Sequence, residues 1–334
     1  MENLVSVIIP NYNGGNTIGK CLEAALASRH GNFEVIVVDD DSRDNSLAII
    51  AQYPCRLVRL AQHGGAAVAR NTGVQHARGE MLFFTDADCL MQGDTLALAA
   101  RSLASEGSGV IIGGSYTLAP YDRRFCSRFQ SIFINFFETR HAPAADYIAT
   151  HALAVDADLF RRHQGFAEDL LPILEDVEFS HRLRRAGCRL VMNPAIQVQH
   201  IFDYSLFRSL RNALVKSKYW TCYAVRNRDL LANSGTASVE LKVNVCSWAL
   251  SGLLLLVSLW SETRAAVAAI PLLLAFNLYV NRGLLLAFRR AEGLSFAVMA
   301  TLYYLLLYPV AVVAGALAGT ALHCRNLAQS GVKR

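Results

Sequence analysis

The sequence predicts an α/β domain with a doubly wound, mostly parallel sheet, followed by an all-α transmembrane domain. Up to about residue 204, continuous apolar runs alternate with helical patterns, which is typical of a parallel sheet that is buried on both faces. Hydrophobic residues make up 53% of the 334 residues, more than an ordinary soluble enzyme carries. The excess lies after residue 243, in long stretches rich in Leu, Ala and Val.

The elements of the first domain follow one another in regular order. Strands are expected at residues 5–10, 33–38, 55–60, 81–84 and 109–117, and helices at residues 16–29, 66–77 and 93–105. Strand, helix and strand in succession form right-handed crossovers, and open sheets of this kind bind ligands at the carboxyl ends of their strands. The chain places three polar segments at these ends, which read NYN (11–13), DDDS (39–42) and TDAD (85–88).

Two amphipathic helices are predicted beyond these elements. Residues 128–140 place their apolar side chains on one helical face, which leaves open a core helix or a helix that lies against lipid or an acyl-chain acceptor. Residues 204–223 combine an apolar face with Arg208, Arg211 and Lys218 on the other face. The second pattern predicts a helix in the membrane interface.

Three apolar stretches, at residues 243–260, 265–288 and 295–322, are near or above the roughly 20 residues that cross hydrocarbon. The chain therefore divides into a first domain (1–203), an interfacial helix and linker (204–242), about three transmembrane helices (243–322) and a polar tail (323–334). The positive-inside rule places the first domain and the basic loop 288–293 in the cytoplasm. The basic tail would then lie outside, a mild contradiction that a re-entrant third stretch would remove.

Composition excludes several other classes of protein. The eight cysteines are scattered singly, without a Cys-x-x-Cys pair, so neither a zinc site nor a disulfide framework is expected, and a reduced cytosol fits best. The N-terminus enters a strand at once, and a cleaved signal peptide is not expected. Basic and aromatic residues do not interleave in the first domain, which argues against nucleic acid as a partner.

Asp86 and Asp88 stand one residue apart, directly after the apolar run MLFF. Because two neighbouring carboxylates repel one another, we expect a cation to join them. Carboxylate oxygens suit hard ions such as Mg²⁺ or Mn²⁺. The alternative is an acidic turn that caps the following helix.

Five segments together resemble the family 2 glycosyltransferases, which have the nucleotide-sugar-binding fold called GT-A. These segments are VSVIIPNYNGG, VIVVDDDSRDNS, GGAAVARNTGVQHARGEMLFFTDAD, LEDVEFSHRLRRAG and VQH, and the resemblance covers residues 5 to about 205. It implies a metal-dependent, inverting transfer of a sugar from a nucleoside diphosphate sugar, a UDP- or GDP-sugar, to an acceptor. With the apolar stretches, it implies an integral membrane protein with its catalytic domain on the cytoplasmic face and a lipid or lipid-linked glycan as acceptor.

The resemblance also assigns roles to single residues. The implied donor-binding residues are Pro10, Asn11, Asn13, Asp39, Asp40, Arg70 and Asp86. Asp88 and His200 would bind Mg²⁺ or Mn²⁺. Asp176 resembles the catalytic base, which takes the proton of the acceptor hydroxyl. His151 and Glu175 are possible residues of the acceptor side.

Several of these residues have structural alternatives. Asp39 and Asp40 could cap the helix that begins near Asn45. Arg70 could be a solvated helix charge, and Glu175 is favoured by the dipole of its helix whatever else it does. His200 could be a core histidine of an edge strand.

The sequence departs from the family pattern in two places, and other functions compete. The acceptor loop reads YIATHALAV instead of a small segment that contains Gly and Asn, and the Gln-x-x-Arg-Trp signature of processive synthases is missing. A polyprenyl-phosphate glycosyl synthase is a close alternative, because its acceptor phosphate is already ionised. From another class, a non-catalytic nucleotide-sugar-binding scaffold is possible, whereas the few polar residues of the apolar stretches disfavour a transporter.

Overall fold

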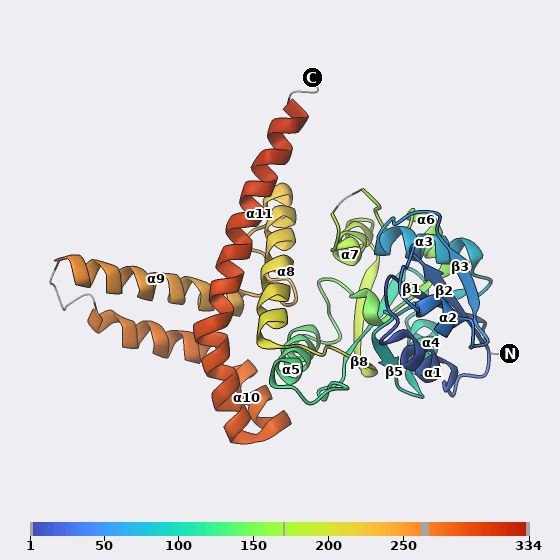
Figure 1. Ribbon diagram of the computed structural model, residues 1–334, viewed down its shortest axis with the longest axis horizontal. Helices are drawn as coiled ribbons and strands as arrows, with labels where there is room; N and C mark the ends of the chain where they lie inside the picture. The colour runs from blue at the N-terminus through green and yellow to red at the C-terminus, as the bar shows by residue number, and fades with distance from the viewer. Residues whose placement is uncertain (1–2, 170, 262–266, 332–334) are drawn as a thin grey trace. The chain divides into compact units, whose positions relative to one another are not determined.

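The computed structural model describes residues 3–169, 171–261 and 267–331. The chain forms two compact units, which Figure 1 shows with the sheet in blue to green and the C-terminal helices in yellow to red. The first unit holds Met1–Arg123 and Phe137–Asp203, and the second holds Arg124–Phe136 and Tyr204–Arg334. The chain passes from sheet to helices at residue 203, but one segment of the predicted first domain, Arg124–Phe136, groups with the C-terminal helices.

Within the described residues, the first unit has one sheet of eight strands in the order β3-β2-β1-β4-β7-β6-β8-β5. The strands are β1 (Val5–Asn11), β2 (Phe33–Asp39), β3 (Arg56–Arg59), β4 (Met81–Phe84), β5 (Cys89–Met91), β6 (Val110–Tyr116), β7 (Leu153–Asp156) and β8 (Arg189–His200). The helices of this unit are α1 (Ile18–Leu26), α2 (Ser46–Ile50), α3 (Ala66–His76), α4 (Thr95–Glu106), α6 (Ala157–Arg162) and α7 (Glu175–Arg185), with a 3₁₀ turn, η1 (Thr150–Ala152).

The first half of the sheet is parallel, as the sequence predicts. Strand β1 pairs in parallel with β2 and β4, and β2 pairs in parallel with β3. These strands read as unbroken apolar runs because both faces are covered: Ile8 and Phe84 pack with Phe179 in the main core. The register places Asn11 opposite Asp39, so the carboxyl ends of β1 and β2 lie side by side.

The second half of the sheet is mixed. Strand β7 pairs antiparallel with β4 and β6, β8 pairs in parallel with β6, and β5 pairs antiparallel with β8. The sequence did not predict β5 and β7. The β5–β8 pair is important for the site, because it places Cys89 opposite His200 and so brings Asp88 next to this histidine.

The second unit is helical. It contains most of α5 (Phe125–Thr139), followed by α8 (Leu206–Asn227), α9 (Val239–Ser261), η2 (Val267–Ala269), α10 (Ile270–Leu302), a π-helical turn η3 (Tyr303–Leu307) and α11 (Tyr308–Gly331). The predicted polar tail is therefore helical as far as Gly331, and residues 332–334 lie outside the described residues.

The apolar face of α5 is buried among the C-terminal helices. Phe129 is fully buried, and its ring lies 5.3 Å from that of Phe288 and 4.8 Å from that of Tyr303. Phe133 also packs on Tyr308, with ring centroids 5.6 Å apart. Of the two alternatives for this helix, the core helix is correct, although its core is that of the helical unit.

Among the residues that the structure describes, two helical segments are long and apolar enough to cross a membrane, by length and composition alone: Val239–Trp260 and Val267–Ala328. The second breaks at Gly293, whose φ of 84° and ψ of 179° leave the helix in a conformation that favours glycine. The break separates the second and third predicted apolar stretches, and residues 265 and 266 of the second stretch lie outside the described residues. At the end of α9, Leu259 and Trp260 are 80% and 93% exposed.

The polar side chains of the apolar helices bond with one another. Asn277 donates to Oδ1 of Asn244 (2.8 Å), and Asn281 donates to Oδ1 of Asn277 (2.7 Å). The Tyr304 hydroxyl donates to Oδ1 of Asn281 (3.0 Å), and Asn244 donates to the Tyr304 carbonyl (2.7 Å), which closes a ring. All four side chains are buried, so the ring joins α9, α10 and the π-helical turn instead of lining a path for a substrate.

Helix α8 lies along α11 in this unit, as Figure 1 shows. Two glycines one turn apart on α11 permit a close approach of the two backbones. A Cβ atom on Gly315 would lie 2.4 Å from the Leu214 carbonyl oxygen, and one on Gly319 would lie 2.2 Å from the Lys218 carbonyl oxygen. Small residues at this spacing allow apolar helices to pack closely. The predicted interfacial helix is thus fixed along one face to α11.

We expect Gly319→Leu to destabilise the helical unit by about 1–3 kcal/mol, because the added side chain must push the α8 backbone away. The measurement is the thermal unfolding midpoint of the detergent-solubilised protein. Gly252→Leu on α9 is the matched control, because a Cβ atom there meets nothing within 4 Å. Equal midpoints for the two variants would contradict the close α8–α11 packing.

Candidate active site

The predicted site residues gather at the carboxyl ends of β1, β2 and β4, the three neighbouring strands that end in polar segments. The loops after β1 and β4 touch each other, since a Cβ atom on Gly14 would lie 3.6 Å from that of Ala87. Ala87 stands between Asp86 and Asp88, so the segment that carries the two carboxylates lies against the loop that contains Asn11 and Asn13.

The loops after β1 and β2 are held together by side chains. Asn11 is buried and donates to Oδ1 of Asp39 (2.8 Å) and to the Ser42 hydroxyl (3.2 Å). The side-chain oxygen of Asn13 accepts a hydrogen bond from the backbone amide of Arg43 (2.8 Å). The backbone amide of Asn13 donates to the Ser42 hydroxyl (2.9 Å). Pro10 lies in β1 opposite Val38. Ser42, which the sequence argument did not single out, therefore links both predicted donor loops.

One alternative was that Asp39 and Asp40 cap the helix that begins near Asn45, and the structure shows that they do not. Helix α2 follows Asn45, and it is Asp44 that accepts from the Ser46 amide (3.0 Å). Oδ2 of Asp39 accepts from the Ser42 amide (3.1 Å). Asp40 accepts from the amides of Gly64 and Gly65, at 2.7 Å and 2.8 Å, directly before α3.

An exposed aromatic pair lies beside Asp40. Nδ1 of His63 is 2.9 Å from Oδ2 of Asp40, and the ring of His63 lies 4.1 Å from that of Tyr12. Tyr12 is 50% exposed. The sequence argument missed both residues, although an aromatic residue directly after a buried strand was a usable signal. The pair presents flat surfaces on which a planar group can stack.

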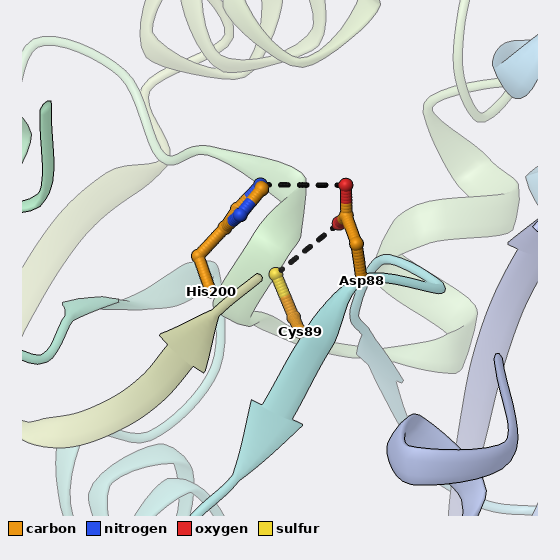
Figure 2. Close-up of side chains that lie close together, drawn as sticks. All are labelled: Asp88, Cys89 and His200. Atoms are coloured by element: carbon orange, nitrogen blue, oxygen red, sulfur yellow. Dashed lines mark hydrogen bonds and ion pairs between the residues drawn. The ribbon is translucent and has the colours of Figure 1, made fainter. Parts of the chain in front are cut away.

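Asp88 and His200 form the metal candidate, which Figure 2 shows with Cys89. Nε2 of His200 is 3.5 Å from Oδ2 of Asp88. Burial raises the pKa of Asp88, and the nearby Asp86 raises it further, whereas His200 opposes both. The Asp88 carboxylate and the His200 imidazole converge, and the Asp86 carboxylate repels that of Asp88. This arrangement suits a divalent cation. Burial also raises the pKa of the Cys89 thiol. Hard ions such as Mg²⁺ and Mn²⁺ prefer oxygen ligands to sulfur, so Cys89 is a poor ligand for them.

Arg70 is a buried clamp, not a solvated helix charge. Its guanidinium donates through Nη2 to Oδ1 of Asp86 (2.6 Å) and through Nη1 to Oε1 of Glu175. Burial lowers the pKa of Arg70, but Asp86 and Glu175 outweigh burial and raise it. Arg70 in turn outweighs the burial of Asp86 and holds the pKa of that carboxyl below its usual value. The clamp joins the acidic loop after β4 to the start of α7.

Asp176 is the residue after the clamped Glu175. Its Oδ2 accepts from the Thr150 amide (3.2 Å), and its Oδ1 accepts from the Val177 amide (2.8 Å). Burial, and next the Glu175 carboxylate, raise the pKa of Asp176 to about 6, against the opposing effect of Arg70. A carboxylate with this pKa is a suitable proton acceptor near neutral pH.

His151 lies in η1 and is 5% exposed. Its Nε2 is 3.4 Å from Oε2 of Glu138, and its ring stacks on Tyr116 at 4.0 Å. Burial lowers the pKa of His151, but Glu138 outweighs burial and raises it. Tyr116 meets the ring of His200 edge-on at 5.0 Å. Tyr116 thus connects His151 to the metal candidate, and Glu138 pairs with His151. Neither residue was among the predicted site residues, because both are distant from His151 along the chain.

Comparison with known proteins identifies the domain. The family model described as "Glycosyl transferase family 2" matches residues 6–162, which carry the loops after β1, β2 and β4 and the Arg70–Asp86 pair, but not Glu175, Asp176 or His200. This domain belongs to glycosyl transferase family 2. The matched residues include the predicted donor-binding residues from Pro10 to Asp86 and the predicted metal ligand Asp88.

Relatives agree with the family. This chain is 32% identical to glycosyltransferase GlyG of Streptococcus pneumoniae over 130 residues. The aligned region covers 37% of this chain and 43% of GlyG. A stretch of 90 residues is 36% identical to the Escherichia coli UDP-Glc:alpha-D-GlcNAc-diphosphoundecaprenol beta-1,3-glucosyltransferase WfgD, covering 26% of this chain and 36% of WfgD. The matched regions span only 26% to 63% of the length of the first curated relatives.

A solved structure has the same fold. The mannosyltransferase PcManGT from Pyrobaculum calidifontis, solved in complex with GDP-Man and Mn²⁺, aligns with a TM-score of 0.57 at 20% identity and covers 96% of this chain and 86% of its own. This similarity confirms the predicted GT-A fold.

Proposed function

We propose that this chain is a membrane-bound, inverting glycosyltransferase that transfers one sugar from a nucleoside diphosphate sugar to a lipid-linked or membrane-proximal hydroxyl acceptor, with Mg²⁺ or Mn²⁺. The observation that carries the proposal is the Arg70 clamp. It joins Asp86, which lies beside the metal candidate, to Glu175, which directly precedes the proposed catalytic base Asp176. Donor-side and acceptor-side groups are therefore parts of one connected site.

The chain's own residues supply binding, orientation and proton transfer. Asp39 and Asp40, together with the Tyr12–His63 pair, offer acceptor groups and stacking surfaces for the nucleoside. Asp88 and His200 would hold the divalent ion, which when bound supplies Lewis-acid stabilisation of the charge on the departing diphosphate. Asp176 takes the proton from the acceptor hydroxyl while that oxygen bonds to the anomeric carbon. The bond to the diphosphate breaks on the opposite face, so the configuration inverts.

The pKa of Asp176 favours a hydroxyl acceptor over a phosphate acceptor. A phosphate is already ionised at neutral pH and gains little from a general base, whereas a hydroxyl gains about 10² to 10⁴ in rate. A carboxyl whose pKa is raised to about 6 is placed to do this work. The relative WfgD, whose name gives a diphosphoundecaprenol-linked sugar as its substrate, supports a lipid-linked acceptor.

The helical unit supports a membrane location. Its two apolar segments expose large side chains such as Leu259 and Trp260, which a protein in water would cover. Arg289 and Arg290 near the Gly293 break are exposed, as are Arg208 and Arg211 on α8. Clustered basic residues prefer the cytoplasmic face, so we place the catalytic unit there.

The test is a donor screen followed by product analysis. We expect one UDP- or GDP-sugar to raise the thermal unfolding midpoint only in the presence of Mn²⁺, with EDTA as the control. Incubation of that donor with membranes is expected to increase the mass of one lipid-linked species by a single sugar. Binding without turnover would instead indicate a nucleotide-sugar-binding scaffold.

A further inference from the structure

Two consecutive residues of α3 hold both ends of the segment that leads to the proposed base. Arg70 binds Glu175 at the start of α7, as described above. Asn71, its neighbour, reaches the other end of the segment, at Phe166. The described residues of this segment, 166–169 and 171–175, therefore lie between two anchors on the same helix, α3.

The side-chain amide of Asn71 forms two hydrogen bonds with the backbone of Phe166. Its Nδ2 donates to the Phe166 carbonyl (2.8 Å), and its Oδ1 accepts from the Phe166 amide (3.0 Å). The same Nδ2 lies 2.8 Å from Oε1 of Glu168. Gly165 has a φ of 61°, and a Cβ atom there would lie 2.6 Å from Oδ1 of Asn71. This close contact needs glycine, so the segment is shaped to receive the Asn71 amide.

The other end of the segment is strained. Leu174 is buried and has a φ of 80°, the left-handed region that a branched side chain rarely adopts. Such a conformation persists only where surrounding contacts over-determine it. The Arg70–Glu175 pair, at the residue next to Leu174, is a contact of this kind, and Asp176 stands two residues beyond Leu174.

We propose that Asn71 is a positioning residue, which holds Phe166 and Glu168 against α3 and so keeps Asp176 within hydrogen-bond reach of the acceptor hydroxyl. Asn71 itself touches no reacting atom in this scheme. The inference rests on the proposed function of Asp176 as the base. A shift of the base by about 1 Å is enough to cost roughly 100-fold in rate.

The test is Asn71→Ala, which removes the contacts to Phe166 and Glu168. We expect kcat to fall about 10- to 100-fold, with binding of the nucleoside diphosphate and Mn²⁺ unchanged by calorimetry. The acid limb of the kcat profile should also move, because a displaced Asp176 changes its distance from the Arg70 charge, which stays on α3. The matched control is Gln75→Ala, which removes an exposed side-chain amide from the same helix. It should leave kcat and the acid limb of the pH profile unchanged.

Two further variants separate positioning from simple loss of stability. Asn71→Asp keeps the volume and the acceptor for the Phe166 amide but places a carboxylate oxygen against the Phe166 carbonyl and Glu168, so kcat should fall at least as far as in the alanine variant. The thermal unfolding midpoints of both variants show whether the loss is measured on folded protein. In the Asp176→Asn background, Asn71→Ala should have no further effect on kcat. An equal loss with and without Asp176, or an unchanged kcat and limb in both Asn71 variants, would overturn the proposal. Full activity of Asp176→Asn alone is a different failure, which would overturn the proposed base.

Discussion

Asp88→Ala is expected to reduce sugar transfer by about 10²- to 10³-fold and to remove its dependence on Mn²⁺, because the variant lacks the carboxylate that would hold the ion. Folding should survive, since the substitution relieves the repulsion between Asp86 and Asp88. The measurements are initial rates over a Mn²⁺ titration and the thermal unfolding midpoint without metal.

The control for this variant is Asp94→Ala. Asp94 precedes α4, is exposed, and its side chain makes no capping hydrogen bond. This control should keep both the rate and the Mn²⁺ dependence. A normal Mn²⁺ titration in Asp88→Ala would show that the Asp88–His200 pair is not the metal site.

Asp176→Asn is expected to lower kcat by about 10² to 10⁴ with a hydroxyl acceptor, because the amide cannot take the acceptor proton. The wild-type protein should also lose activity in acid. The base acts only when ionised, so with a pKa of about 6 the rate should be full above that pH and fall about tenfold per unit below it. The variant should lack this acid limb.

Measuring kcat from pH 4.5 to 8 in both proteins tests this prediction. Asp158→Asn, a substitution of an 80% exposed aspartate on α6, controls for the loss of a charge. Near-normal turnover of Asp176→Asn would exclude general-base catalysis and would favour the alternative acceptor, an ionised polyprenyl phosphate.

Patterns that are local in the sequence predicted most of the fold. The runs VSVIIP, FEVIVV and MLFF each form the expected parallel strand, since both faces of these strands are buried. Strand β5 was missed because Cys89–Met91 is too short to carry a period, and it exists only through its pairing with β8. The apolar residues along one face of α5 predicted that this face is buried. Such a pattern does not tell which helices cover the face.

The site was predicted in part for the same reason. Strand ends in a parallel sheet meet at one edge, so Asn11, Asp39 and Asp86 could be grouped from their positions alone. The Arg70–Glu175 pair joins residues 105 positions apart, and such a contact leaves no mark in local spacing. The raised pKa of Asp176 likewise depends on burial, which appears only after folding.

The placement of α5 has a practical consequence for anyone who wants to produce the sugar-transferring part alone. A recombinant fragment that stops at Asp203 would keep Phe129 and Phe133 but lose Phe288, Tyr303 and Tyr308, which cover them. The aromatic stripe would then face water, and such fragments should precipitate or require detergent. A fragment boundary chosen from the end of the sheet would thus cut through a hydrophobic core.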